Sequence, residues 1–137
     1  MIGYTTVGTN DIKKAAVFYD KVAAALGGGR AMEFNHNGEK VEKDGDFILW
    51  ANDPKKPGFA VTKPFNGEAA NVGNGVMIAL SAGSRDTVKK VYDVAIKAGA
   101  SCEGKPGIRG SESGGFYAAY FRDLDGNKLN AFCFDPQ

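Results

Sequence analysis

The same pattern occurs twice in this sequence, as YTTVGTNDIKKAAVFYDKVAAA at residues 4–25 and as MIALSAGSRDTVKKVYDVAIKA at residues 77–98. The two segments match without a gap at an offset of 73 positions, so that Tyr19 aligns with Tyr92. In both, a short strand leads to a polar capping residue and then to apolar residues at helical spacing. Chance similarity between two amphipathic helices is the alternative interpretation. Because strand, cap and helix all keep the same offset, we favour an internal duplication.

Each half of the chain is predicted to contain a strand, a helix and three further strands. Asn10 or Asp11 caps the first helix and Ser84 the second, because their side-chain oxygens can accept from free amides of the first turn. The glycine-rich residues 104–115 are predicted as a long loop. We predict helices at 12–26 and 85–98, and strands at 2–9, 30–34, 46–50, 59–62, 75–81, 100–103, 116–121 and 128–134.

These elements define two modules of a single α+β domain. The modules span about residues 1–65 and 74–137, and the polar residues 66–73 join them. A chain of half this length is only marginally stable on its own. We therefore expect the two modules to share one buried surface.

The composition is that of one compact domain and excludes several functional classes. The chain has 137 residues and a net charge of +1, so it lacks the excess of positive charge by which proteins bind nucleic acid or an anionic membrane. Its longest apolar runs fall far below the roughly 20 residues of a membrane helix, and no secretory signal follows Met1. Cys102 and Cys133 are therefore predicted to be reduced thiols of a cytoplasmic protein. The single histidine, His36, excludes any site that needs two.

Two short motifs indicate a family. Residues 18–20, FYD, resemble the "FY" helix of the glyoxalase/bleomycin resistance protein/extradiol dioxygenase superfamily, also called the vicinal oxygen chelate superfamily. Residues 121–127, FRDLDGN, resemble its F-R-D-P-D-G-N turn, with Leu124 where the family usually has proline. The resemblance extends over essentially the whole chain. It implies two tandem βαβββ modules that form a curved, mostly antiparallel sheet around a cavity.

The resemblance also implies where a metal would bind. Active members of the superfamily hold a divalent ion in the cavity, typically by His on the first strand and by Glu or His on the last strand of each module. The corresponding positions here hold Tyr4, Met77 and Asn130, and residues 59–61 offer no ligating side chain. A neutral phenol, a thioether and an amide are poor ligands for zinc and for hard divalent ions. We therefore predict no metal cofactor, and we place His36 in a solvated turn.

The alternation of side chains along strands predicts the lining of the cavity. Asn130 should face inward and Cys133 toward the helices, and Arg109 can reach over the cavity to an anionic ligand. The alternatives are that the aromatic and methionine side chains only fill a core and that Arg109 is an exposed loop charge. The predicted ligand-binding residues are Tyr4, Thr6, Trp50, Met77, Arg109, Tyr120 and Asn130.

Three functions are compatible with such a lining. The first is a small-molecule binding protein that works without a metal, of the sequestering kind that bleomycin resistance proteins represent. The second is an enzyme, namely a lactoylglutathione-lyase-like lyase, an isomerase or a dioxygenase-like protein, in which Tyr4 or Tyr120 acts as acid or base or a metal is held unconventionally. The third is a structural or partner-binding domain with a filled core. Exposed sheet edges and a near-neutral charge, together with the resemblance to a superfamily whose members are commonly symmetric dimers, predict a two-fold homodimer in which modules paired within one chain or across two form two cavities.

Overall fold

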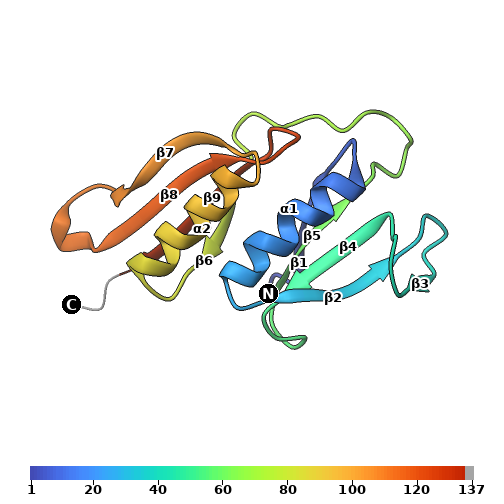
Figure 1. Ribbon diagram of the computed structural model, residues 1–137, viewed down its shortest axis with the longest axis horizontal. Coiled ribbons are helices and arrows are strands. Elements are labelled where there is room, and N and C mark those ends of the chain that lie inside the picture. The colour runs from blue at the N-terminus through green and yellow to red at the C-terminus, as the bar shows by residue number, and fades with distance from the viewer. Residues whose placement is uncertain (135–137) are drawn as a thin grey trace.

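A computed structural model describes residues 1–134, which contain two α-helices and nine strands (Figure 1). The first module contains β1 (Tyr4–Gly8), α1 (Ile12–Ala25), β2 (Gly29–Phe34), β3 (Lys40–Val41), β4 (Phe47–Ala51) and β5 (Gly58–Thr62). The second contains β6 (Ile78–Ser81), α2 (Arg85–Lys97), β7 (Ser101–Ile108), a short 3-10 helix (Glu112–Gly114), β8 (Phe116–Arg122) and β9 (Lys128–Phe134). The last three residues of the predicted second module, 135–137, lie outside the described part of the chain.

The strands form two sheets with related topology. The strand order is β1-β5-β4-β2-β3 in the first module and β6-β9-β8-β7 in the second. In each sheet the strand that precedes the helix pairs in parallel with the last strand of the module, and the other pairs are antiparallel. The α+β class and the two βαβββ modules are therefore confirmed, with the two-residue β3 as an addition in the first. The hydrogen-bond ladder itself is divided into two separate sheets rather than one.

The prediction of a long loop at residues 104–115 is wrong for its first part, because β7 continues to Ile108. The register of β7 with β8 shifts between Cys102 and Gly104 and again between Gly104 and Gly107. Such bulges accommodate glycine and proline, which sequence patterns assign to loops, because the ladder is interrupted there. The connection between β7 and β8 is therefore shorter than predicted.

The two helices begin in the same way, as the duplication predicts. Asp11 Oδ1 accepts from the backbone N–H of Lys14, and Ser84 Oγ accepts from that of Thr87, at 3.1 Å in both cases. Each cap satisfies an amide that the first turn leaves without an intrahelical partner. The helices then lie side by side on one side of the two sheets (Figure 1). Neither of these two described helices has the length and apolar content to cross a membrane.

One hydrophobic core joins the two modules. It fills the space between helices and sheets, and its most deeply buried side chains include Phe18 on α1, Val91 on α2 and Phe121 on β8. The expectation that the modules share a buried surface is thus confirmed. Cys133 also lies in this core, which confirms its predicted direction toward the helices, whereas Cys102 is exposed, and neither cysteine is in a disulfide.

A polar network around Asp123 makes a second connection between the modules. The Asp123 carboxylate accepts from the phenol of Tyr19 on α1 at 2.6 Å, and from the backbone N–H and the side-chain amide of Asn127 at 2.8 and 2.9 Å. The same amide donates to the carbonyl of Gly8 at the end of β1. Burial and the neighbouring carboxylate raise the pKa of Tyr19 well above its usual value, so the phenol stays protonated and donates. We call these contacts the Asp123 joint, since they tie the turn between β8 and β9 to the first module.

Candidate functional site

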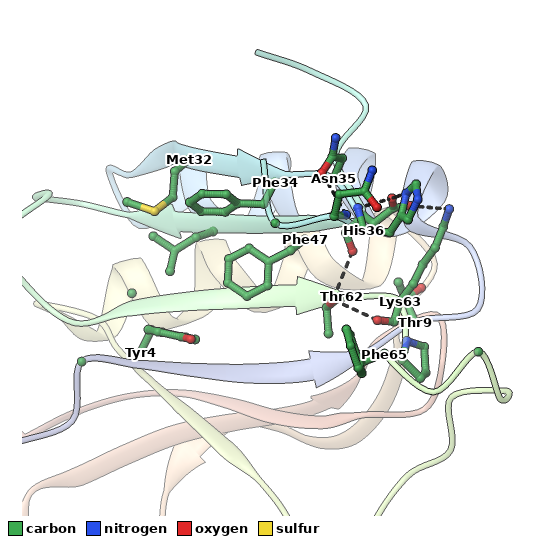
Figure 2. Close-up of a pocket in the computed structure, with 18 of the residues that line it drawn as sticks. Tyr4, Thr9, Met32, Phe34, Asn35, His36, Phe47, Thr62, Lys63 and Phe65 are labelled. Atoms are coloured by element: carbon green, nitrogen blue, oxygen red, sulfur yellow. Dashed lines mark hydrogen bonds and ion pairs between the residues drawn. The ribbon is translucent and has the colours of Figure 1, made fainter. Parts of the chain in front are cut away.

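A cavity of about 1390 Å³ lies on the face of the first sheet that turns away from the helices (Figure 2). Side chains alternate along β4, so that Phe47 points into the cavity and the next residue, Ile48, lies in the core. The ring of Phe47 lies 5.8 Å from the ring of Tyr4 on β1 and 6.0 Å from that of Phe34 on β2, both in edge contacts. These three rings form an apolar floor that extends across the sheet.

One end of the cavity is polar. Asp46 lies there, with Lys63 Nζ 2.6 Å from its Oδ1 and the backbone N–H of His36 3.0 Å from its Oδ2. The His36 ring, which is mostly exposed at the rim, has its Nδ1 3.6 Å from the same Oδ2. The ammonium group of Lys63 holds the pKa of Asp46 below its ordinary value, so the carboxylate is ionised at neutral pH. Because the charges of Lys63 and Asp46 oppose each other, this end offers donors and acceptors without a net charge.

Asp46 is positioned by a tight turn with a buried support. Glu33 on β2 is 4% exposed, and its carboxylate accepts from the backbone N–H of Gly45 at 3.1 Å and from Arg30 at 2.8 Å. A Cβ atom on Gly45 would lie 2.9 Å from Glu33 Cβ and from the carbonyl oxygen of Phe34, so the close approach requires glycine. The backbone N–H of Asp46 then donates to the Phe34 carbonyl at 2.8 Å. We therefore expect the position of the Asp46 carboxylate to depend on Glu33.

The segment between the modules forms one wall of the cavity. Pro64, Phe65 and residues 67–69 line it, and the side chain of Phe65 is fully exposed at the rim. The Asn10 side chain holds the end of this wall, since its Nδ2 donates to the carbonyl of Ala70 at 3.0 Å and its Oδ1 accepts from the Ala70 N–H at 2.7 Å. The wall is thus fastened to the start of α1.

Of the predicted ligand-binding residues, Tyr4 is the one that lines this cavity, while Thr6 is exposed further along β1. Trp50 lies in the core instead, where its Nε1 donates to Asp20 on α1 at 2.9 Å. The prediction that Trp50 faces the cavity is therefore wrong. Trp50 is three positions from Phe47 on the same strand, so the two side chains point to opposite faces.

The floor and the polar end of the cavity are not among the residues predicted from the sequence. Phe34 and Phe47 could have been found from strand alternation, because both of their strands were predicted. His36 was placed in a turn, which is correct, but its contact with Asp46 at the rim was not foreseen. No local pattern signals that Asp46 and Lys63 form an ion pair.

Tyr120 and Asn130 lie on the second sheet, again on the face that turns away from the helices, and Met77 and Arg109 lie next to the ends of its strands β6 and β7. Tyr120 on β8 is the register partner of Asn130 on β9, and the adjacent Leu129 is in the core, which confirms the predicted direction of Asn130. The Arg109 guanidinium lies 5.4 Å from the Tyr120 ring, and Met77 is exposed just before β6. The structure thus separates the predicted set into Tyr4 and Thr6 at the first sheet, Trp50 in the core and the other residues at the second sheet, and ligand binding by these residues stays a prediction.

Comparisons with known proteins identify the family. The model of the Glyoxalase/Bleomycin resistance protein/Dioxygenase superfamily matches residues 1–131. The chain belongs to this superfamily. A glyoxalase/bleomycin resistance protein from Albidiferax ferrireducens T118 is similar, with 31% identity, a TM-score of 0.78, and coverage of 96% of this chain and 97% of that chain. The resemblance drawn from residues 18–20 and 121–127 is therefore confirmed.

More distant superfamily members share the fold. A family enzyme from Burkholderia phytofirmans PsJN is 17% identical with a TM-score of 0.67, over 97% of this chain and 98% of that one. A lactoylglutathione lyase from Agrobacterium tumefaciens is 16% identical with a TM-score of 0.62, over 96% and 92% of the two chains. At such identities the likeness shows the fold alone. No curated protein sequence matches this chain significantly.

The positions at which active superfamily members bind a metal hold unsuitable donors here. Tyr4 supplies a phenol, Met77 a thioether and Asn130 an amide, and zinc or a hard divalent ion is bound by carboxylates, imidazoles or thiolates in preference to these groups. Within residues 1–134, no three His, Cys, Asp or Glu side chains come together as a set that could hold an ion. The donor chemistry therefore does not fit the superfamily's metal.

Proposed function

We propose that this protein binds a small, uncharged aromatic molecule in the cavity of the first sheet, without a metal. The observation that carries the proposal is the floor of Tyr4, Phe34 and Phe47 beside the charge-balanced pair of Asp46 and Lys63. An apolar pocket with a few convergent polar groups is the usual form of a small-molecule site. Aromatic floors favour a planar ring, because edge-to-face and offset contacts add to the burial of apolar area.

The charges around the cavity favour a neutral ligand over an ionic one. Besides Asp46 and Lys63, the lining contains Lys56 and Glu68, so that cations and carboxylates are equal in number. An anionic ligand would have to compete with Asp46 for the ammonium group of Lys63, which Asp46 already contacts at 2.6 Å. A hydroxyl or carbonyl substituent can instead bond to this end without displacing either partner.

Metal-free binding in the cytoplasm fits the remaining chemistry of the chain. The donors at the superfamily's metal positions are poor ligands, as described above, and the aromatic floor requires no ion. Two cysteines outside any disulfide, Cys102 exposed and Cys133 buried, are in line with a reducing compartment.

We further propose that two copies assemble as a two-fold homodimer. The sheet faces that turn away from the helices expose large apolar side chains, among them Tyr4 at 57% and Phe134 at 65%. In addition, β1 and β6 each form an edge of their sheet, and exposed edges favour pairing. Pairing the first module of one copy with the second module of the other would join these edges and leave the two sheet faces to line the cavities. Light scattering at micromolar concentration should give twice 14.5 kDa, and a mass near 14.5 kDa would contradict the dimer.

Binding can be tested with N-phenyl-1-naphthylamine, a neutral aromatic probe whose fluorescence rises in apolar sites. Protein treated with EDTA should bind the probe saturably. Phe47→Ala should weaken the affinity roughly tenfold or more, because burying a phenyl ring contributes about 1.5–3 kcal/mol. Phe47→Leu, which keeps most of the apolar volume, should weaken it less.

A matched control is Val76→Ala, which shortens an apolar side chain that is 58% exposed and does not line the cavity. This variant should bind the probe as the parent protein does. Equal affinities of the parent protein and Phe47→Ala would contradict the proposed site. Binding that EDTA abolishes and zinc restores would contradict its independence of metal.

A further inference from the structure

Two cations flank one tyrosine ring on the second sheet, outside the cavity described above. The guanidinium carbon of Arg109 lies 5.4 Å from the centroid of the Tyr120 ring, and Lys128 Nζ lies 5.8 Å from it. Tyr120 alternates along β8 with the core residues Ala119 and Phe121, so its ring faces away from the helices. Cation–π contacts of this kind hold the charges close to an otherwise apolar surface.

The Arg109 side chain is bound to backbone carbonyls of β7, where two glycines leave room for it. Its Nη2 donates to the carbonyl of Lys105 at 2.6 Å, and its Nη1 lies 3.4 Å from the carbonyl of Ile108. Cβ atoms on Gly104 and Gly107 would lie 3.1 and 3.2 Å from these two nitrogens, so larger residues would displace the guanidinium. A guanidinium has five N–H donors, and the carbonyls engage two of them. The other donors remain for a ligand.

The positive charge at this place is not balanced. Within the described part of the chain, no carboxylate lies within ion-pair distance of Arg109. Lys128 has one weak partner, Glu103, at 3.9 Å, and Glu103 is mainly the acceptor for Arg122. Arg122 and Lys128 therefore share the carboxylate of Glu103 while Arg109 contacts none, and a local excess of positive charge attracts anions.

Asn130, the register partner of Tyr120, presents a buried acceptor on this face, which a water or a donor group of a ligand can satisfy but a carboxylate cannot. Its side chain is 2% exposed, and its Oδ1 has no hydrogen-bond partner in the described structure. A buried acceptor without a partner costs about 1–3 kcal/mol, so such groups are rare unless a ligand or water pairs with them.

Aromatic rings cover the adjoining part of this face. Phe116 lies 5.6 Å from Phe132 and 5.2 Å from Phe134, measured between ring centroids. Phe116 and Phe132 are on the same face as Tyr120 and Asn130, because each is an even number of positions away along its strand. A ligand on this face would meet cations at one end and phenyl rings at the other.

We propose that this face of the second sheet binds a small aromatic carboxylate. The carboxylate accepts from the guanidinium of Arg109, the ring of the ligand lies toward Phe116 and Phe132, and Lys128 on the other side of Tyr120 adds positive charge. Charge-assisted hydrogen bonds to a guanidinium are stronger than neutral ones, and the fork of donors suits the two oxygens of a carboxylate. This site is additional to the proposed neutral site on the first sheet.

Benzoate is a suitable probe, with the neutral isostere benzamide for comparison. In nitrogen-15-labelled protein, benzoate should shift the amide signals of Gly104 and Gly107, which lie under the guanidinium. Arg109→Gln should weaken benzoate binding roughly tenfold, and higher salt should also weaken it. Lys21→Gln, which removes a cation exposed on α1, is the matched control and should leave the affinity unchanged.

Two results would overturn the proposal: equal binding of benzoate and benzamide, or equal affinities of the parent protein and Arg109→Gln. Arg109→Lys keeps the positive charge but loses the paired N–H donors of the guanidinium. It should therefore retain part of the affinity for benzoate, which separates an electrostatic effect from a folding defect. Phe47→Ala should leave benzoate binding unchanged while it weakens binding of the naphthylamine probe. Failure of one site is thus distinguishable from failure of the other.

Discussion

Replacement of Asp123 by alanine should lower the free energy of unfolding by about 3 kcal/mol. The carboxylate is buried and accepts from the Tyr19 phenol, from the Asp125 N–H and twice from Asn127. Alanine leaves these donors without an acceptor, and an unsatisfied buried donor costs more than a hydrogen bond contributes on average. Urea denaturation followed by the fluorescence of Trp50, the single tryptophan, measures the loss.

Tyr19→Phe tests the Asp123 joint from the first module. It removes one donor and leaves the carboxylate with Asn127 and Asp125, so the expected loss is about 1 kcal/mol. Asp86→Ala, at an exposed position in the first turn of α2, is the matched control and should change stability by less than about 0.5 kcal/mol. If Asp123→Ala also lost less than that, the apolar core alone would hold the modules together.

Much of the fold could be predicted because its signals are local. A capping side chain acts within one helical turn, so Asp11 and Ser84 locate the helix starts from sequence alone. The duplication added long-range information, since it showed that both halves have the same order of elements. It thereby predicted the two modules and their shared core before any contact between them was known.

The wrong predictions concern residues at which tertiary contacts override the local preference for a loop or for one face of a strand. Gly104 and Gly107 are typical of a loop, yet β7 continues through them because β8 supplies a ladder and the bulges absorb the mismatch. Trp50 was assigned to the cavity from its place at the end of a strand. The direction of its side chain follows from alternation and from its partner Asp20 on α1, and this contact cannot be inferred from local sequence.

The candidate site was only partly predictable because it depends on pairing between distant residues. Phe47 pairs with Thr62 across β4 and β5, and this register brings the preceding Asp46 next to the following Lys63. The neutral polar end of the cavity is a product of that pairing. The contact of Arg109 with Tyr120 likewise depends on the course of β7, which the sequence analysis had assigned to a loop.

The buried Glu33 links the stability of the first sheet to the shape of its cavity. Its carboxylate accepts from the backbone N–H of Gly45, which is buried, and from Arg30, which also contacts Asp20. The residue after Gly45 is Asp46, the carboxylate at the polar end of the cavity. Loss of Glu33 should therefore loosen this turn as well as destabilise the fold.

Glu33→Ala should lower the free energy of unfolding by about 2–3 kcal/mol, because the Gly45 amide loses its acceptor and Arg30 loses one of two carboxylate partners. Glu33→Gln keeps one acceptor oxygen and should cost about 1 kcal/mol. Glu42→Ala, an exposed carboxylate in the same module, should have little effect on either stability or binding. Urea denaturation gives the stabilities, and titration with N-phenyl-1-naphthylamine under conditions where each variant is folded gives the affinities.

Because Glu33 holds the turn that presents Asp46, Glu33→Ala should bind the probe more weakly than Glu33→Gln does. Unchanged probe affinity in a destabilised Glu33→Ala would show that the turn keeps its shape without Glu33 and that this residue supports the sheet alone.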